Sequence, residues 1–253
     1  MERVMKNTIH IAATRTATAM TATAMIGVLS LVQGLLILIP TIVLGQAIGW
    51  PGSLGDPAPV ALPRLLEHAS AVRLGYGAYL LLSMLFVVTI TILARLSRGQ
   101  TMASLMPFIV SFAMASTMFR TIGIIRWLIP MPQLATSWAS ATTDQERYAI
   151  SVAFDMLNAY GGTIGEVLGV SLFAAIALVL LCFAAFKDRL FPTWLVGFGM
   201  IATLALIATT SEIVGIDPGA IVAVLSTTLI QFWFMAVGVW LLIRSTKQPV
   251  TVS

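Results

Sequence analysis

Six long apolar runs constrain this chain more than any other feature of its sequence. A transmembrane helix needs about 20 apolar residues to cross the hydrocarbon core of a bilayer, and every run approaches or exceeds that length. Only 9% of the residues are charged, whereas soluble domains carry roughly 25%. The runs occupy residues 25–48, 72–94, 102–129, 163–186, 194–211 and 219–243. We therefore predict an all-α polytopic membrane protein, a bundle of about six transmembrane helices, with residues 1–253 forming a single transmembrane domain.

A short basic segment, residues 1–24, precedes the first run and resembles the start of a secretory signal. The apolar region of a signal peptide is only about 7–15 residues long. The run at 25–48 is far longer, and no clean small-residue cleavage site closes it. We therefore expect this run to be a retained first span and residues 1–24 to be a cytoplasmic N-terminal segment.

The lysines and arginines indicate the orientation, because cytoplasmic loops retain basic residues. One side of the predicted spans collects Arg3, Lys6, Arg15, Arg95, Arg98, Lys187, Arg189, Arg244 and Lys247. Most acidic residues fall on the opposite side. We predict a multi-pass protein of the cell membrane with both termini in the cytoplasm. Since the basic residues are scattered singly between apolar runs, we expect the lipid bilayer as a partner and no nucleic acid.

The longest predicted loop, residues 130–162, lies on the extracytoplasmic side between the third and fourth spans. Thr143 and Glu146 have the spacing of a capping box, which predicts the start of a helix. A short extracytoplasmic amphipathic helix is expected to follow, lying on the membrane or capping the bundle. The same helix running straight into the fourth span stays open, because glycines at 161 and 162 weaken a helix without necessarily ending it.

Charged residues at membrane depth are the sharpest site candidates. Arg120 is about 27 Å along the third span, Arg126 lies further out, and Glu166 and Glu212 reach the same layer from the fourth and fifth spans. A charge in hydrocarbon costs at least about 2.5–3.5 kcal/mol, so such residues usually face the bundle interior, a partner or water. We expect Arg120 to pair with Glu166, and Arg126 to pair with Glu212 or Asp155.

This charge network has two interpretations. It forms either a polar pocket at the outer face, for a ligand, an ion or a lipid headgroup, or an interhelical tie with snorkelling arginines. If the network forms a pocket, we expect a noncatalytic protein that binds or senses a ligand, or an accessory subunit of another complex. A small secondary transporter or permease-like protein is the alternative, although the midplane is almost wholly apolar. An intramembrane enzyme is a third.

Glycines and prolines within the spans predict close helix packing and kinks. Gly161, Gly165 and Gly169 repeat at four-residue spacing, which lets another helix approach closely. This stripe serves either packing within one chain or the face of a homodimer, and a different membrane protein as partner also stays open. Pro40 and Pro107 lack a backbone donor inside predicted spans and are expected to kink them.

No catalytic residue, metal site or cofactor is predicted. The sequence lacks the glycine-rich phosphate loop, the zinc-protease motif and the nucleophile elbow. His10 and His68 stand alone, without cysteine or carboxylate neighbours at ligand spacing. Cys182 is the only cysteine, so an intrachain disulfide is excluded.

Two segments of the C-terminal part resemble a known family. Residues 187–199 read KDRLFPTWLVGFG, and residues 231–245 read QFWFMAVGVWLLIRS. Both are similar to the bacterial membrane family catalogued as domain of unknown function 4386. The resemblance implies six helices in one bundle, with a basic and proline-containing turn before the fifth span. It implies no functional residues.

Overall fold

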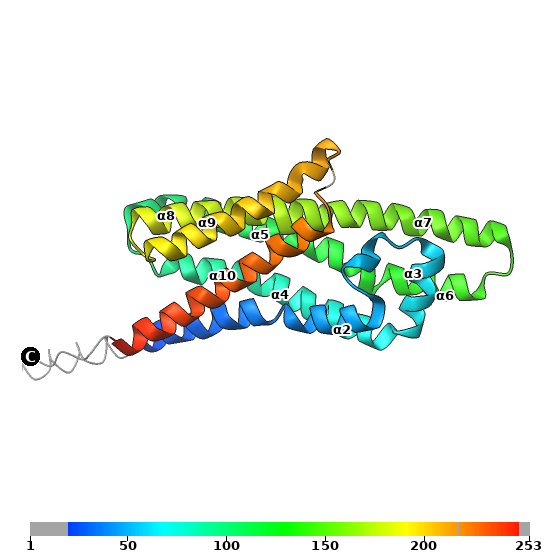
Figure 1. Ribbon diagram of the computed structural model, residues 1–253, viewed down its shortest axis with the longest axis horizontal. Helices are drawn as coiled ribbons and strands as arrows, with labels where there is room; N and C mark the ends of the chain where they lie inside the picture. Colours follow the sequence, from blue (N-terminus) through cyan, green and yellow to red (C-terminus); the bar gives the residue numbers. More distant parts are fainter. Residues whose placement is uncertain (1–19, 217, 248–253) are drawn as a thin grey trace, which may run out of the picture.

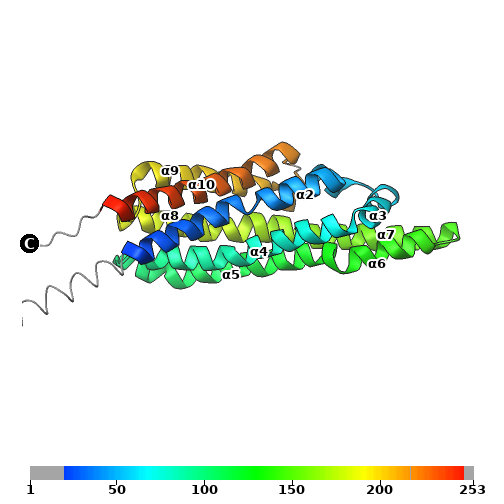
Figure 2. The ribbon, with the colours of Figure 1, turned by 90° about the horizontal axis from the view of Figure 1, so that it is seen from below.

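The computed structural model describes residues 20–216 and 218–247, and these residues form an elongated helical bundle (Figure 1). Six helices in it are long and apolar enough to cross a membrane, and the described residues contain no strand. The predicted all-α class and the predicted bundle of six spans are therefore confirmed. The first and last described residues lie at the same end of the bundle (Figure 2).

The elements follow one another along the chain as a series of helices. They are a helix at 20–35, α2 (Leu38–Ile48), η1 (Gly52–Gly55), α3 (Ala58–Glu67), α4 (Ala69–Arg95), α5 (Gln100–Leu128), α6 (Pro130–Ser140), α7 (Asp144–Gly162), η2 (Thr163–Phe173), α8 (Ala174–Lys187), α9 (Thr193–Ala208), η3 (Thr209–Val214) and α10 (Ala220–Lys247).

The first span is interrupted at residues 36–37, between the helix at 20–35 and α2. Pro40 explains the interruption, because it has no N–H to donate to the carbonyl of Leu36 and its ring collides with that carbonyl. The N–H of Ile39 donates to the Leu36 carbonyl instead, at 3.2 Å. The predicted effect of Pro40 is therefore local, and it changes the direction of the chain at the start of α2.

The region 130–162 is helical along most of its length, although it was predicted as a loop with one short helix. α6 follows α5 directly, and α7 begins at the predicted capping box. The Thr143 hydroxyl accepts from the N–H of Glu146 at 3.2 Å, and the Glu146 carboxylate accepts from the N–H of Thr143 at 3.0 Å. Because α7 continues without a break into η2 and α8, the helix runs into the fourth span.

The third and fourth spans are much longer than a bilayer requires. The helices Gln100–Ser140 and Asp144–Lys187 contain 41 and 44 residues, which corresponds to about 60–66 Å, or twice the hydrocarbon thickness. Their far ends, α6 and α7, extend past the other spans together with α3 (Figure 1). Leu62, Met131 and Phe154 are buried between these three helices, which we call the cap.

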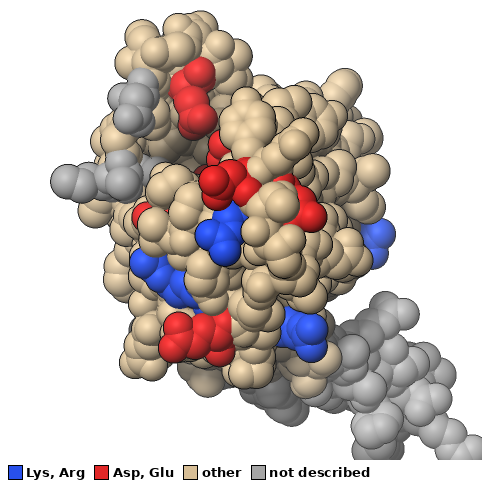
Figure 3. Space-filling model, turned by 90° about the vertical axis from the view of Figure 1, so that its right-hand side faces the viewer, with Lys and Arg blue, Asp and Glu red and all other residues tan. Residues whose placement is uncertain are grey.

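The surface of the cap is unlike the apolar sides of the bundle. Viewed end-on, it carries acidic and basic side chains together (Figure 3). Arg64 and Asp56 form an ion pair of 2.7 Å there, with both side chains about one-third exposed. Mixed charges of this kind suit contact with water, as expected for helical segments that continue beyond the hydrocarbon layer.

The predicted glycine stripe lies against α5 of the same chain. A Cβ added to Gly165 would lie 2.7 Å from the Cα of Gly123 in α5, so the two backbones touch. Gly161 lies against the Arg126 side chain, and Gly169 lies against the backbone of Arg120. The contact between Gly123 and Gly165 therefore sets the distance between the third and fourth spans, at a level between Arg120 and Arg126.

Candidate functional site

A cavity of about 880 Å³ lies between α2, α4, α5, η2, η3 and α10. This volume is within the range of about 300–1,000 Å³ that small-molecule sites occupy. Most of its wall is apolar, and the charged residues that line it, among those that the structure describes, are four of the five that the sequence singled out. They are Arg120, Arg126, Glu166 and Glu212.

Arg126 and Glu166 form an ion pair on the cavity wall. The Arg126 Nη2 atom lies 3.0 Å from the Glu166 Oε1 atom. The Arg126 side chain is 5% exposed and that of Glu166 is 51% exposed, because the glutamate faces the open space of the cavity. The Arg126 guanidinium also lies 5.3 Å from the ring centre of Trp127. The predicted pairing of Arg126 with Glu212 or Asp155 is therefore wrong.

Arg120 is buried and pairs with no carboxylate of the described residues. Its Nε and Nη2 atoms donate long hydrogen bonds of 3.4 and 3.5 Å to the carbonyls of Gly169 and Val170. The guanidinium stacks over Phe86 at 4.6 Å from the ring centre. The predicted pair of Arg120 with Glu166 is wrong as well, since Glu166 pairs with Arg126. The cavity thus has in its wall a buried cation that no anionic group of the described residues neutralises.

The helix that faces both arginines is wound as a π-helix. η2 extends over 11 residues, Thr163–Phe173, and π-helical turns are frequent at functional sites. Inside a membrane, a backbone carbonyl that lacks its regular helical hydrogen bond needs another hydrogen-bond donor. The Gly169 carbonyl has two, since the Ser116 hydroxyl donates to it at 2.7 Å in addition to Arg120. Arg120 and Ser116 therefore stabilise the irregular winding that positions Glu166.

Comparison with known proteins places the chain in a family. A family model described as Domain of unknown function (DUF4386) matches residues 25–245. The chain belongs to this family. The match confirms the resemblance seen in the C-terminal segments and extends it over all six apolar helices of this DUF4386 protein. No curated protein and no solved structure matches the chain.

The two remaining predicted residues behave differently in this DUF4386 member. Glu212, in η3, lines the cavity, is exposed, and pairs with no basic group of the described chain. Asp155 is exposed on α7 and is not part of the cavity wall. The structure therefore brings Arg120, Arg126, Glu166 and Glu212 together around one space and leaves Asp155 outside it.

Tyr76 and Gln231 are polar residues of the wall that were not singled out from the sequence. Each keeps one buried polar atom without a hydrogen-bond partner in the described chain, Oη in Tyr76 and Oε1 in Gln231, and so does Arg126 at its Nε atom. A buried polar group without a partner costs about 1–3 kcal/mol. Gln231 was detectable in principle, because an amide within an apolar span is unusual. Among the described residues, no group of three or more His, Cys, Asp or Glu side chains is placed to hold a metal ion.

The cavity opens sideways, between α2 and α10 of this DUF4386 protein. The helix at 20–35 crosses α10 at Gly27 and Gly238, where a Cβ on Gly238 would lie 2.7 Å from the Gly27 carbonyl oxygen. Beyond this crossing, α2 and α10 diverge (Figure 1). Leu38 and Phe232 line the opening and are 50% and 52% exposed. The opening therefore lies on an apolar side of the bundle, the side that faces lipid in a bilayer.

Proposed function

We propose that this DUF4386 protein is a noncatalytic binding protein for an amphipathic molecule that enters its cavity from the membrane. The polar head of the ligand contacts Arg120, and its hydrocarbon part lies along the apolar wall between α2 and α10. The observation that carries this proposal is Arg120 itself, a buried arginine on the wall of a large cavity without a carboxylate partner in the described chain.

The charges of the wall favour an anionic or strongly polar head. Glu166 is already paired with Arg126 at 3.0 Å, so it does not neutralise Arg120. A buried charge without a partner is strongly unfavourable, and an anionic group beside it offsets much of that penalty. The planar guanidinium of arginine suits a carboxylate or a phosphate, each of which accepts two parallel hydrogen bonds.

The shape of the cavity favours a molecule that is otherwise apolar. Its opening is bordered by exposed apolar side chains such as Leu38 and Phe232. A ligand dissolved in the bilayer reaches Arg120 through this opening without crossing water. With the predicted orientation, in which both termini are cytoplasmic in the cell membrane, the cavity belongs to the outer half of the bilayer and the cap lies outside it.

The apolar core supports binding over transport. A transporter needs a polar path from this cavity to the other end of the bundle. Toward that end, however, the buried polar residues of α4 and α5 are only small hydroxyl residues, Ser83, Thr89, Ser116 and Thr117, and among the described residues no buried charge lies beyond Arg120. Between them are fully buried apolar residues: Phe86 and Ile90 on α4, Ile109 and Ala113 on α5, and Phe234 and Val237 on α10.

The proposal is tested by identifying what purifies with the protein. The full chain is extracted in mild detergent, and its bound amphiphiles are released and quantified by mass spectrometry. Arg120→Gln removes the charge at the cavity, and Arg73→Gln removes an exposed charge on α4 that is not part of the wall. We expect one amphiphile to be retained by the wild type and by R73Q, and to fall at least about tenfold in R120Q, since a hydrogen bond to a charged group contributes about 1.5–3 kcal/mol.

Two outcomes would overturn the proposal. One is a wild-type protein, folded by gel filtration and thermal unfolding, that carries no stoichiometric amphiphile. The other is an R120Q protein that retains as much as R73Q does. If R120Q does not fold, Arg120→Lys replaces it, because lysine keeps the charge and loses the planar two-point contact.

A further inference from the structure

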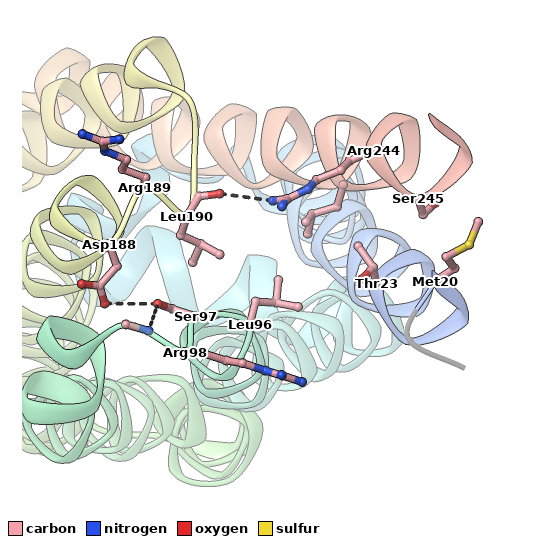
Figure 4. A pocket seen from close by; sticks show the side chains of 12 residues that line it. Met20, Thr23, Leu96, Ser97, Arg98, Asp188, Arg189, Leu190, Arg244 and Ser245 are labelled. Carbon is pink, nitrogen blue, oxygen red and sulfur yellow. Dashed lines mark hydrogen bonds between the residues drawn. The ribbon is translucent and has the colours of Figure 1, made fainter. Parts of the chain in front are cut away.

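A second cavity, of about 390 Å³, lies at the opposite end of the bundle. Here the first and last described helices meet the loops that join α4 to α5 and α8 to α9 (Figure 4). This is the end that the distribution of lysines and arginines predicts to be cytoplasmic. The large apolar core of the bundle separates it from the first cavity.

Among the described residues, the one carboxylate in this wall is that of Asp188, and it already accepts several hydrogen bonds from the protein. It accepts hydrogen bonds from the backbone N–H of Met102 at 2.8 Å, the backbone N–H of Thr101 at 3.3 Å and the Ser97 hydroxyl at 3.1 Å. A side chain at Gly99 would collide with it. Asp188 therefore caps the start of α5 from another loop, and the N–H of Met102 is the main reason why its pKa lies below the usual value.

Three arginines of the same wall have no ion pair within the described residues: Arg98, Arg189 and Arg244. Figure 4 shows Arg244 reaching across the opening toward Leu190, Arg98 on the opposite side, and Arg189 turned outward at the rim. The only hydrogen bond of Arg244 to the described chain is a long one, 3.5 Å to the Leu190 carbonyl, and its guanidinium lies 5.1 Å from the ring centre of Trp240. The cavity therefore has an excess of positive charge.

The loop that carries Arg189 has an unusual backbone. Arg189 has a φ of 54°, in the left-handed region that residues other than glycine rarely adopt. This conformation turns the chain between Asp188, which caps α5, and Leu190, whose carbonyl receives Arg244. The two sides of the cavity are thus fixed by one tight loop rather than by an ion pair.

We propose that this basic cavity binds a phosphate group, held between Arg98 and Arg244. Two guanidinium groups on opposite sides of one opening match the several acceptor oxygens of a phosphate, and arginine contacts such groups in a two-point geometry. Leu96, Leu190 and Leu241 supply apolar wall beside them. Basic pockets between transmembrane helices on the cytoplasmic side suit anionic lipid headgroups, so the phosphate is that of a membrane lipid or of a small soluble molecule.

The test compares lipids on the delipidated full chain by native mass spectrometry. Phosphatidylglycerol, which is anionic, and phosphatidylcholine, which is zwitterionic, are titrated onto the wild type and three variants. Arg98→Gln and Arg244→Gln each remove one proposed phosphate contact. The matched control is Arg95→Gln, which removes an exposed arginine from the same end of the bundle but outside the cavity wall.

We expect the wild type to bind phosphatidylglycerol at least about tenfold more tightly than phosphatidylcholine. R98Q and R244Q should each lose about tenfold in affinity, as the removal of one charged hydrogen-bonding group predicts, and R95Q should stay within about twofold of the wild type. Equal binding of the two lipids would overturn the proposal, and so would an R95Q loss as large as that of R98Q. If R244Q does not fold, R98Q alone decides, because Arg98 is exposed and its replacement is not expected to disturb the packing of the bundle.

A competition arm separates the two sources of phosphate. Millimolar inorganic phosphate is added to the complex of the wild type with phosphatidylglycerol. Displacement that is lost in R98Q assigns the cavity to a soluble phosphate compound. Retention of the lipid, together with the sensitivity of lipid binding to R98Q, assigns it to a lipid headgroup.

Discussion

Replacement of Gly165 by alanine probes the contact on which the first cavity is built. The new Cβ would lie 2.7 Å from the Cα of Gly123, whereas ordinary van der Waals contacts begin at 3.4 Å. The neighbouring atoms are backbone on both sides, so α5 and η2 have to separate by about 0.7 Å. Overpacking of this kind typically destabilises the folded protein by about 1–3 kcal/mol. The higher helix propensity of alanine relative to glycine offsets about 0.5–1 kcal/mol of this loss. We expect a net loss of about 1–2 kcal/mol in the free energy of unfolding.

Gly77→Ala is the matched control for this change. Gly77 is also a helical glycine within a span, on α4, but a Cβ there meets nothing within 4 Å. G77A should therefore be neutral or stabilise by up to about 1 kcal/mol. The assay is reversible unfolding in mixed micelles of mild detergent and dodecyl sulfate, followed by tryptophan fluorescence. If G165A is as stable as G77A, the backbones of α5 and η2 do not touch as described.

Three further measurements address other contacts. For the ion pair of Arg126 and Glu166, a double-mutant cycle with R126Q and E166Q should give a coupling of about 0.5–3 kcal/mol in the same unfolding assay, whereas additive losses would contradict the 3.0 Å contact. For Asp188, the lowered pKa means that its stabilising effect is complete above the pKa of the unfolded chain, about 3.9, and is lost as the pH falls through the lower folded value. Acid should therefore destabilise the wild type near the second cavity more than it destabilises D188N, and equal acid sensitivity of the two proteins would contradict this cap. For the capping box, Thr143→Ala should lose about 1 kcal/mol of local stability at the start of α7, seen as faster amide hydrogen exchange there; unchanged exchange would contradict the cap.

The sequence predicted the elements that depend on local pattern. Six apolar runs gave six spans, and the spacing of Thr143 and Glu146 gave the start of α7. The helical character of α6 was missed, because its serines and threonines resemble a loop. Its buried residues Met131 and Ala135 pack in the cap, and such tertiary contacts are not visible in local composition.

The partners of the arginines could not be predicted from spacing. The expected pairs assumed regular helices with a rise of 1.5 Å per residue. η2 is π-helical, so the side chain of Glu166 lies at a different angle around the helix axis, beside Arg126 rather than Arg120. The depth of the four charged residues was sufficient to suggest one shared layer. Which of them meet depends on helix rotation, for which the sequence has no clear signal.

The break at residues 36–37 has a geometric effect on the entrance between α2 and α10. From Ile37 to Ile48 the chain rises by about 17 Å, so each 10° of bend at the break moves the far end of α2 by about 3 Å. The missing amide hydrogen of Pro40 therefore acts over a long lever arm. Pro40 is not part of the cavity wall, but through this bend it affects the width of the opening by which a lipid-soluble ligand would enter.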